Sequence, residues 1–152
     1  MNMTHSEHRS DAGLATALRI SVSRLARRLR VERTVPGLTE PDLSETQLAA
    51  LAALERHGAM TSGELADHEK VQPPSMTRVI SVLAESQLVR RDPHESDRRQ
   101  VVLTVTDGGR ELVNRARRRR DVWLAKRLKE LTPAERATLR AAAPILEKLS
   151  QS

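Results

Sequence analysis

Five arginines stand in one short stretch, residues 71–104, which reads VQPPSMTRVISVLAESQLVRRDPHESDRRQVVLT. Arg78 stands in its first half, and two adjacent pairs, Arg90 with Arg91 and Arg98 with Arg99, stand in its second half. A guanidinium group is always charged, and its planar fork of donors fits phosphate oxygens and the O6 and N7 atoms of guanine. The chemistry that these residues offer is therefore charge-assisted hydrogen bonding to an anion or to a base edge.

An amphipathic helix must position Arg78. The apolar residues of this helix recur at intervals of three and four: Met76, Val79, Ile80 and Leu83. The remaining sides carry Pro74, Ser75, Thr77, Arg78, Ser81 and Glu85. Pro73 or Pro74 fits the first helical position, where a missing N–H costs nothing. The pattern predicts one buried side and one polar side, on which Arg78 contacts a base, a phosphate or an acid such as Glu85.

A β-hairpin must position the other arginines. Val89–Arg91 is typical of a short strand, Asp92 and Pro93 indicate a turn, and Arg98–Val105 alternates as a second strand. The tip of the hairpin holds Glu95, Asp97, Arg98 and Arg99. A helix followed by a basic-tipped hairpin is the layout of a winged helix-turn-helix. The helix fits the major groove of DNA, about 12 Å wide, and the tip fits the minor groove, about 6 Å wide.

Two short helices are expected before this stretch. Ser44 and Gln47 fit a capping box that starts a helix ending at Gly58, and Thr61 and Glu64 fit a second box that starts a helix ending near Lys70. The short turn to Pro73 completes the helix-turn-helix pattern.

Long amphipathic helices flank this central region. The first runs from Ala12 to about Val35 with a near-heptad seam of Leu14, Leu18, Val22, Leu25 and Leu29, followed by a linker punctuated by Pro36, Gly37 and Pro41. Thr106 is expected to cap a helix that runs to about Leu131, and Thr132 to cap the last one. A narrow apolar seam on a long helix needs a neighbour to cover it, so the seam favours packing on a partner chain.

The sequence therefore predicts a mainly α fold with a small β-hairpin wing, in which terminal helices form a dimerisation region around a winged helix-turn-helix. We expect an N-terminal tail and dimerisation helix at 1–41, a DNA-binding domain at 42–112 and C-terminal dimerisation helices at 113–152.

Composition excludes several function classes. The chain has no Cys, Phe or Tyr and a single Trp, which argues against thiol chemistry and against single-strand binding by base stacking. We expect no cofactor and no metal, because His5 and His8 lack a third ligand. No nucleophile–base set or phosphate loop is present, so an enzyme is not expected. No apolar run nears the length of a membrane span, about 18 residues, and the N-terminal residues lack the apolar core of a signal peptide, so we expect a cytoplasmic protein.

Net charge does not by itself mark the central region. The whole chain carries +6, yet residues 42–112 hold 8 basic and 12 acidic side chains. The positions of the arginines, rather than bulk charge, favour nucleic acid. A winged-helix module that binds another protein remains the alternative.

The residues just described resemble the MarR family of bacterial transcriptional regulators over nearly the whole chain. The resemblance is carried by LADHEKVQPPSMTRVISVLAESQLV and by RRDPHESDRRQVVLTVTDGGREL. It implies an obligate homodimer with interlocking terminal helices that binds a pseudo-palindromic operator in double-stranded DNA. It further implies a regulator, most commonly a repressor, released by a small and often anionic aromatic effector.

Position by position, the resemblance places Pro74, Ser75, Thr77 and Arg78 against DNA, Arg99 in the minor groove and Asp97 as the acid that orients the wing arginines. The complete set of candidate DNA-binding residues is Pro73, Pro74, Ser75, Thr77, Arg78, Ser81, Arg91, Asp97, Arg98 and Arg99. Two residues depart from the family pattern. Gln72 replaces a Ser or Thr cap, and Gln87 replaces a Gly, which requires Gln87 to adopt a positive φ.

The arginines of residues 115–120 and the single tryptophan, Trp123, each have two possible roles. Arg115 and the run Arg117–Arg120 form a solvated or acid-paired face, or else contact phosphate. Trp123 packs in a dimer core or stacks on an aromatic effector, and the residues of an effector pocket do not follow from the sequence.

Overall fold

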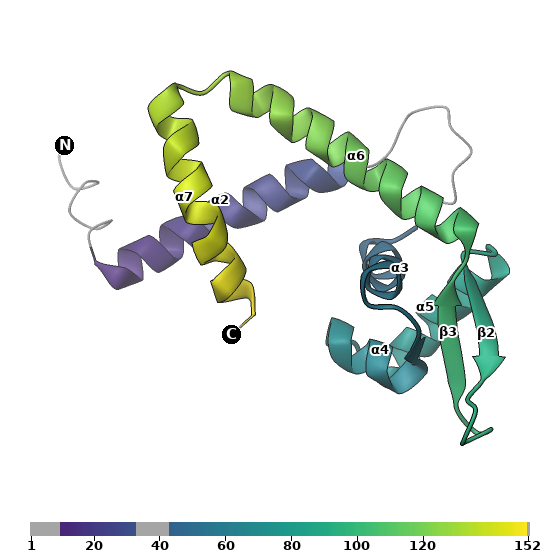
Figure 1. Ribbon diagram of the computed structural model, residues 1–152. Helices are drawn as coiled ribbons and strands as arrows, with labels where there is room; N and C mark the ends of the chain where they lie inside the picture. The colour runs from purple at the N-terminus through teal and green to yellow at the C-terminus, as the bar shows by residue number, and fades with distance from the viewer. Residues whose placement is uncertain (1–9, 33–42, 152) are drawn as a thin grey trace. The chain divides into compact units, whose positions relative to one another are not determined.

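The computed structural model describes residues 10–32 and 43–151 (Figure 1). The elements are α2 (Asp11–Val31), α3 (Glu45–His57), β1 (Met60–Thr61), α4 (Ser62–Glu69), α5 (Pro73–Glu85), β2 (Val89–Pro93), β3 (Val101–Val105), α6 (Asp107–Lys129) and α7 (Pro133–Ser150). The tail with His5 and His8 and the linker with Pro36, Gly37 and Pro41 lie outside the described residues. The predicted fold class, mainly helical with a winged helix-turn-helix, is confirmed.

The described residues form two compact units. One contains α3 to α5, the sheet and α6 as far as Arg118, and we call it the winged-helix unit. The other contains α2, the part of α6 from Arg119 onward and α7, and we call it the terminal-helix unit.

Local hydrogen bonds begin the helices where the sequence predicted. Ser44, Thr61 and Thr132 each cap a helix in a reciprocal capping box. At Thr61 the backbone N–H donates to the Glu64 carboxylate at 2.8 Å, and this bond holds the pKa of Glu64 below its ordinary value. Gln72 makes no side-chain cap bond, so α5 starts from its proline alone.

The sheet has three strands in the order β1-β3-β2, one more than the predicted hairpin. Met60 pairs with Leu103, and β1 was missed because a two-residue strand shows no alternation. The turn predicted at Asp92 and Pro93 is wrong: these residues extend β2 and pair with β3. Because β2 is an edge strand, the missing N–H of Pro93 can be tolerated there.

The core of the winged-helix unit includes side chains from α3, α4, α5 and β3. Its largest fully buried side chains are Leu51, Leu54, Leu65, Met76, Leu83 and Leu103. The four apolar residues predicted on the buried side of α5 are all buried. This packing fixes which side of α5 faces outward.

The terminal-helix unit keeps much of its apolar surface open. Neither α2 nor α7 has a buried residue. The exposed apolar side chains of these two helices are Leu14, Ile20, Val22, Leu25, Val31, Leu139, Ile145, Leu146 and Leu149.

Gln87 adopts the predicted left-handed conformation, with φ of 58°. Its N–H donates to the Ala84 carbonyl at 3.0 Å, and its carbonyl accepts from the Thr106 hydroxyl at 2.8 Å. These backbone bonds hold a conformation that a side chain disfavours. Lys70, at the end of α4, has a φ of 54°, which the sequence did not predict.

We expect Gln87→Gly to stabilise the protein by about 0.5–1 kcal/mol, because glycine adopts a positive φ without steric cost. Urea unfolding measures the difference. Ser86→Gly is the matched control, because Ser86 has a φ of −80° and gains nothing from glycine. A Gln87→Gly variant no more stable than the parent chain would show that the strain is absent.

Candidate nucleic-acid interface

One side of α5 is open to a ligand. Its candidate residues Pro73, Pro74, Ser75, Thr77 and Arg78 are exposed, and Ser81 is half-buried. The helix packs its opposite side on α3, α4 and β2, beside the sheet in Figure 1. The N-terminus of α5 therefore presents polar side chains and the backbone N–H of Ser75 on one surface, because Pro73 and Pro74 have no N–H.

Hydrogen bonds between residues four positions apart orient the hydroxyl groups on the polar side of α5. The Thr77 hydroxyl donates to the Pro73 carbonyl at 3.0 Å, and the Ser81 hydroxyl donates to the Thr77 carbonyl at 3.1 Å. Both hydroxyl protons are thus used within the helix, which leaves the oxygens as acceptors.

Arg91 joins the sheet to α5. Its Nη2 donates to the Ser81 hydroxyl oxygen at 3.2 Å, across the contact between β2 and α5. The sequence singled out both residues as separate DNA contacts and missed that they bond to each other. The bond fixes one guanidinium on the polar side of α5 and leaves its other donors available.

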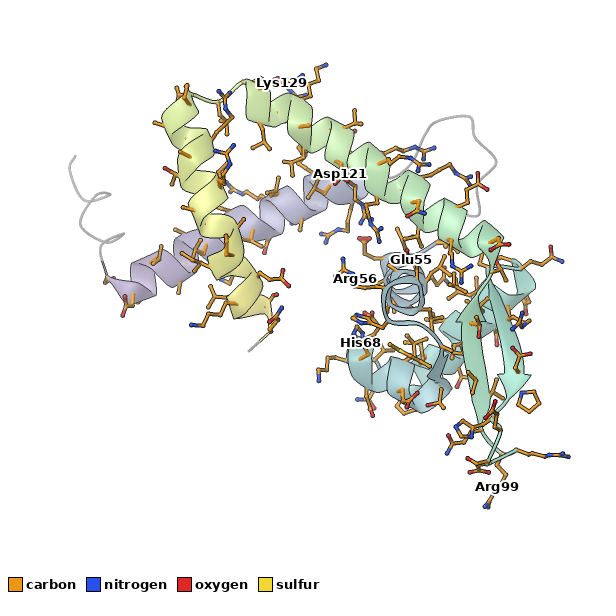
Figure 2. The ribbon with its side chains drawn as sticks, viewed as in Figure 1. Glu55, Arg56, His68, Arg99, Asp121 and Lys129 are labelled. Atoms are coloured by element: carbon orange, nitrogen blue, oxygen red, sulfur yellow. The ribbon has the colours of Figure 1, made fainter. Side chains whose placement is uncertain are left out.

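The tip of the wing is organised around Asp97. Its carboxylate accepts from the Arg99 backbone N–H at 3.1 Å and lies 3.4 Å from Arg99 Nε. The Arg99 side chain is 94% exposed, and Figure 2 shows Arg99 at the far end of the hairpin. The ion pair with Asp97 leaves most of the Arg99 guanidinium facing outward.

His94 is a wing residue that sequence reasoning missed. Its Nδ1 accepts from the backbone N–H groups of Ser96 and Asp97, each at 3.3 Å. The spacing of the tip residues does not predict these bonds to His94, because they depend on the backbone path of the turn. Arg98 lines an open hollow with Pro93, His94 and Glu95.

Two candidate arginines are available for an external partner. Within residues 10–32 and 43–151, the side chains of Arg78 and Arg98 have no hydrogen bond or ion pair, so the alternative pairing of Arg78 with Glu85 is not formed. Arg90, which was not a candidate, instead pairs with Asp92, with 2.7 Å between Nε and Oδ2.

Several arginines of α6 are paired with acids. Arg115 lies 2.6 Å from Glu111, and Arg117 lies 3.0 Å from Glu55 of α3. These distances support the acid-paired interpretation for Arg115 and Arg117. In the terminal-helix unit, the guanidinium carbons of Arg28 and Arg127 lie 5.5 and 5.7 Å from the ring centroid of Trp123.

Metal centres and membrane spans are two other kinds of feature. Among the described residues, no group of three or more His, Cys, Asp or Glu could hold a metal ion. In the same ranges, no helix is both long and apolar enough to cross a membrane.

A helix-turn-helix whose second helix exposes a polar side next to a basic-tipped hairpin defines a winged-helix DNA-binding protein. The sequence profile of the MarR family matches residues 43–101. An HTH-type transcriptional regulator of Mycobacterium tuberculosis is 48% identical over 137 residues, which cover 90% of this chain and 92% of the relative. The chain belongs to the MarR family of transcriptional regulators, whose members bind DNA and are not enzymes.

Relatives and solved structures agree with this assignment. The repressor MdtR of Bacillus subtilis is 27% identical, and the match covers 91% of this chain and 87% of the relative. A crystal structure described as a transcriptional regulator from Pseudomonas aeruginosa is 32% identical with a TM-score of 0.78, covering 93% of this chain and 96% of that one. A mutant MarR of E. coli, 24% identical with a TM-score of 0.73 over 90% of this chain and 95% of that one, shares the fold.

Proposed function

We propose that this protein acts as a homodimer that binds a pseudo-palindromic operator in double-stranded DNA, as a repressor that a small effector releases. The observation that carries the proposal is the exposed polar side of α5, with Arg78 unpaired among the described residues, next to a wing whose tip presents Arg99. Such a regulator works where the chromosome lies, in the cytoplasm.

In this proposal α5 enters the major groove. Its N-terminus supplies the positive end of a helix dipole and the backbone N–H of Ser75, which favour phosphate. Arg78 lies one turn further along and donates to the O6 and N7 atoms of a guanine. Arg91, held on Ser81 at 3.2 Å, contacts the phosphate backbone beside the groove.

The wing enters the adjacent minor groove. Arg99 is the residue that inserts, and Asp97 limits its freedom through the bonds to its backbone and side chain. A narrow minor groove over A·T-rich sequence concentrates negative potential, so the wing would read DNA shape rather than base edges.

The terminal-helix unit supplies the surface for a partner copy. Exposed apolar side chains lie along α2 and α7, including Leu14, Val22, Leu139 and Ile145. Covering such a surface is favourable by about 25 cal/mol for each Å² buried. A twofold pair also places two reading helices about 34 Å apart, one turn of DNA, which matches a palindromic operator.

Two observations support release by an effector: the resemblance to the family and the cluster around Trp123. Trp123 is half-buried, with Arg28 and Arg127 over its ring, and this cluster offers both charge and an aromatic face to an anionic aromatic molecule. The name of the Bacillus subtilis relative, a repressor, supports the sign of regulation.

Selection of bound duplexes from a random pool tests the proposal. We expect one enriched sequence with two inverted half-sites, and affinity for it that falls steeply as salt is added, since phosphate contacts release counterions. The alternative, a module that binds proteins, draws support from the excess of acidic residues in 42–112. It predicts no enriched sequence and weak binding to any duplex.

Arg78→Ala is expected to reduce the discrimination between the selected operator and a variant in which one guanine is replaced. The expected reduction is about 5–150-fold, since a bidentate contact contributes about 1–3 kcal/mol. Competition gel shifts measure the ratio. Arg78→Lys is the matched control, because it keeps the charge and loses the fork of donors. If the lysine variant discriminates as well as the parent chain, Arg78 contacts phosphate rather than a base.

A further inference from the structure

Two imidazole rings face each other in the winged-helix unit, away from the wing. His57 is the last residue of α3, and His68 lies in the last turn of α4. Their ring centroids are 4.8 Å apart, and the ring planes are tilted by 55°. Both residues are exposed, and Figure 2 shows His68 at one end of α4. Neither the operator contacts nor the dimer surface uses this pair.

The separation of the rings suits a shared metal ion. A zinc ion lies about 2.0–2.1 Å from a ligating imidazole nitrogen, and hence about 3.2 Å from the ring centre. Two such rings that subtend about 90–110° at the metal have centres about 4.5–5.2 Å apart. The observed 4.8 Å falls inside this interval. The tilt of 55° also excludes a parallel stack.

Glu69 orients the imidazole ring of His68 for metal binding. The Nδ1 atom of His68 lies 3.4 Å from the Glu69 carboxylate, and the Glu69 side chain is only 20% exposed. A carboxylate on one imidazole nitrogen fixes the tautomer and raises the basicity of the other nitrogen, as is usual for metal-binding histidines. His68 therefore presents Nε2 as its free ligand atom.

The ends of two helices and one carboxylate favour a cation beside the pair, whereas Arg56 and Lys70, the chain neighbours of His57 and Glu69, add positive charge. His57 and His68 both lie in the last turns of helices, where the backbone carbonyls form the negative end of the dipole. The carboxylate of Glu69 adds a full negative charge beside His68.

We propose that His57 and His68 bind a divalent first-row transition metal of the zinc type through one imidazole nitrogen each, with water at the remaining positions and Glu69 as the positioning residue of His68. Imidazole suits zinc, nickel and copper, whereas magnesium prefers oxygen ligands. The metal links the end of α3 to the end of α4, the two helices on which α5 packs.

Isothermal titration of the untagged full chain with Zn²⁺ tests the proposal. The parent chain for the test carries His5→Gln and His8→Gln, which removes the HxxH pair that lies outside the described residues. We expect one zinc per chain and no binding of Mg²⁺. His57→Gln and His68→Gln should each weaken the affinity by at least about tenfold, and Glu69→Ala by about tenfold.

His94→Gln is the matched control, because His94 lies on the wing and should leave zinc binding unchanged. As a readout that needs no variant at the site, the imidazole NMR signals of His57 and His68 should shift with zinc while those of His94 stay in place. The proposal fails if the parent chain binds no zinc, if either glutamine variant at the pair binds as tightly as the parent, or if the NMR shifts fall elsewhere. Any of these results leaves only a ring–ring contact.

Discussion

We expect Arg99→Ala to lower the affinity for the selected operator by about 100-fold or more and to leave the proposed dimer intact. Each hydrogen bond to a charged group contributes about 1.5–3 kcal/mol, and a twofold pair loses one wing contact in each half-site. The Arg99 side chain is 94% exposed, so its removal costs the folded chain little. Gel shifts measure the affinity, and analytical ultracentrifugation measures the oligomeric state.

Arg90→Ala is the matched control for this experiment. Arg90 lies on β2 of the same hairpin, carries the same charge and pairs with Asp92 at 2.7 Å. Removing it changes the net charge equally, so its effect on affinity should be several-fold smaller. Equal losses in the two variants would mean that general attraction, rather than a positioned wing, binds the DNA. If Arg99→Ala bound the operator with unchanged affinity, Arg99 of the wing would not contact the DNA.

We expect Gly109→Ala to destabilise the protein by about 2–3 kcal/mol, the usual range for forcing atoms into a filled core. A Cβ atom at Gly109 would lie 2.3 Å from the Leu88 carbonyl oxygen and 2.8 Å from Val105 Cγ2. The Leu88 carbonyl cannot move away freely, because it accepts from the Thr106 N–H at 3.0 Å. The first turn of α6 must therefore approach the sheet more closely than alanine permits. Denaturant unfolding measures the loss.

Gly108→Ala provides the comparison within the same helical turn. A Cβ atom at Gly108 meets only the Thr106 hydroxyl, at 3.8 Å. Alanine there gains helix propensity of up to about 1 kcal/mol, so this variant should be as stable as the parent or more so. If the two variants unfold alike, the close approach of α6 to Leu88 does not constrain the fold.

The sequence predicts most of the helices correctly because their determinants are local. Ser44, Thr61 and Thr132 each bond to a residue three positions away, so the capping box is visible in the order of residues. The polar and apolar sides of α5 follow in the same way from its period. The left-handed conformation of Gln87 was also predicted, because the family that the chain resembles has Gly at this position in the turn after α5.

The sequence by itself therefore determined the family, the helix starts, the outward side of α5 and the identity of the candidate arginines. The tertiary structure alone decided that β1 joins β3, that Arg91 bonds to Ser81, that His94 orders the wing tip and that His57 faces His68. The physical reason is separation along the chain. A contact within one helical turn depends on neighbouring residues, whereas a contact between elements depends on how the core brings their backbones together.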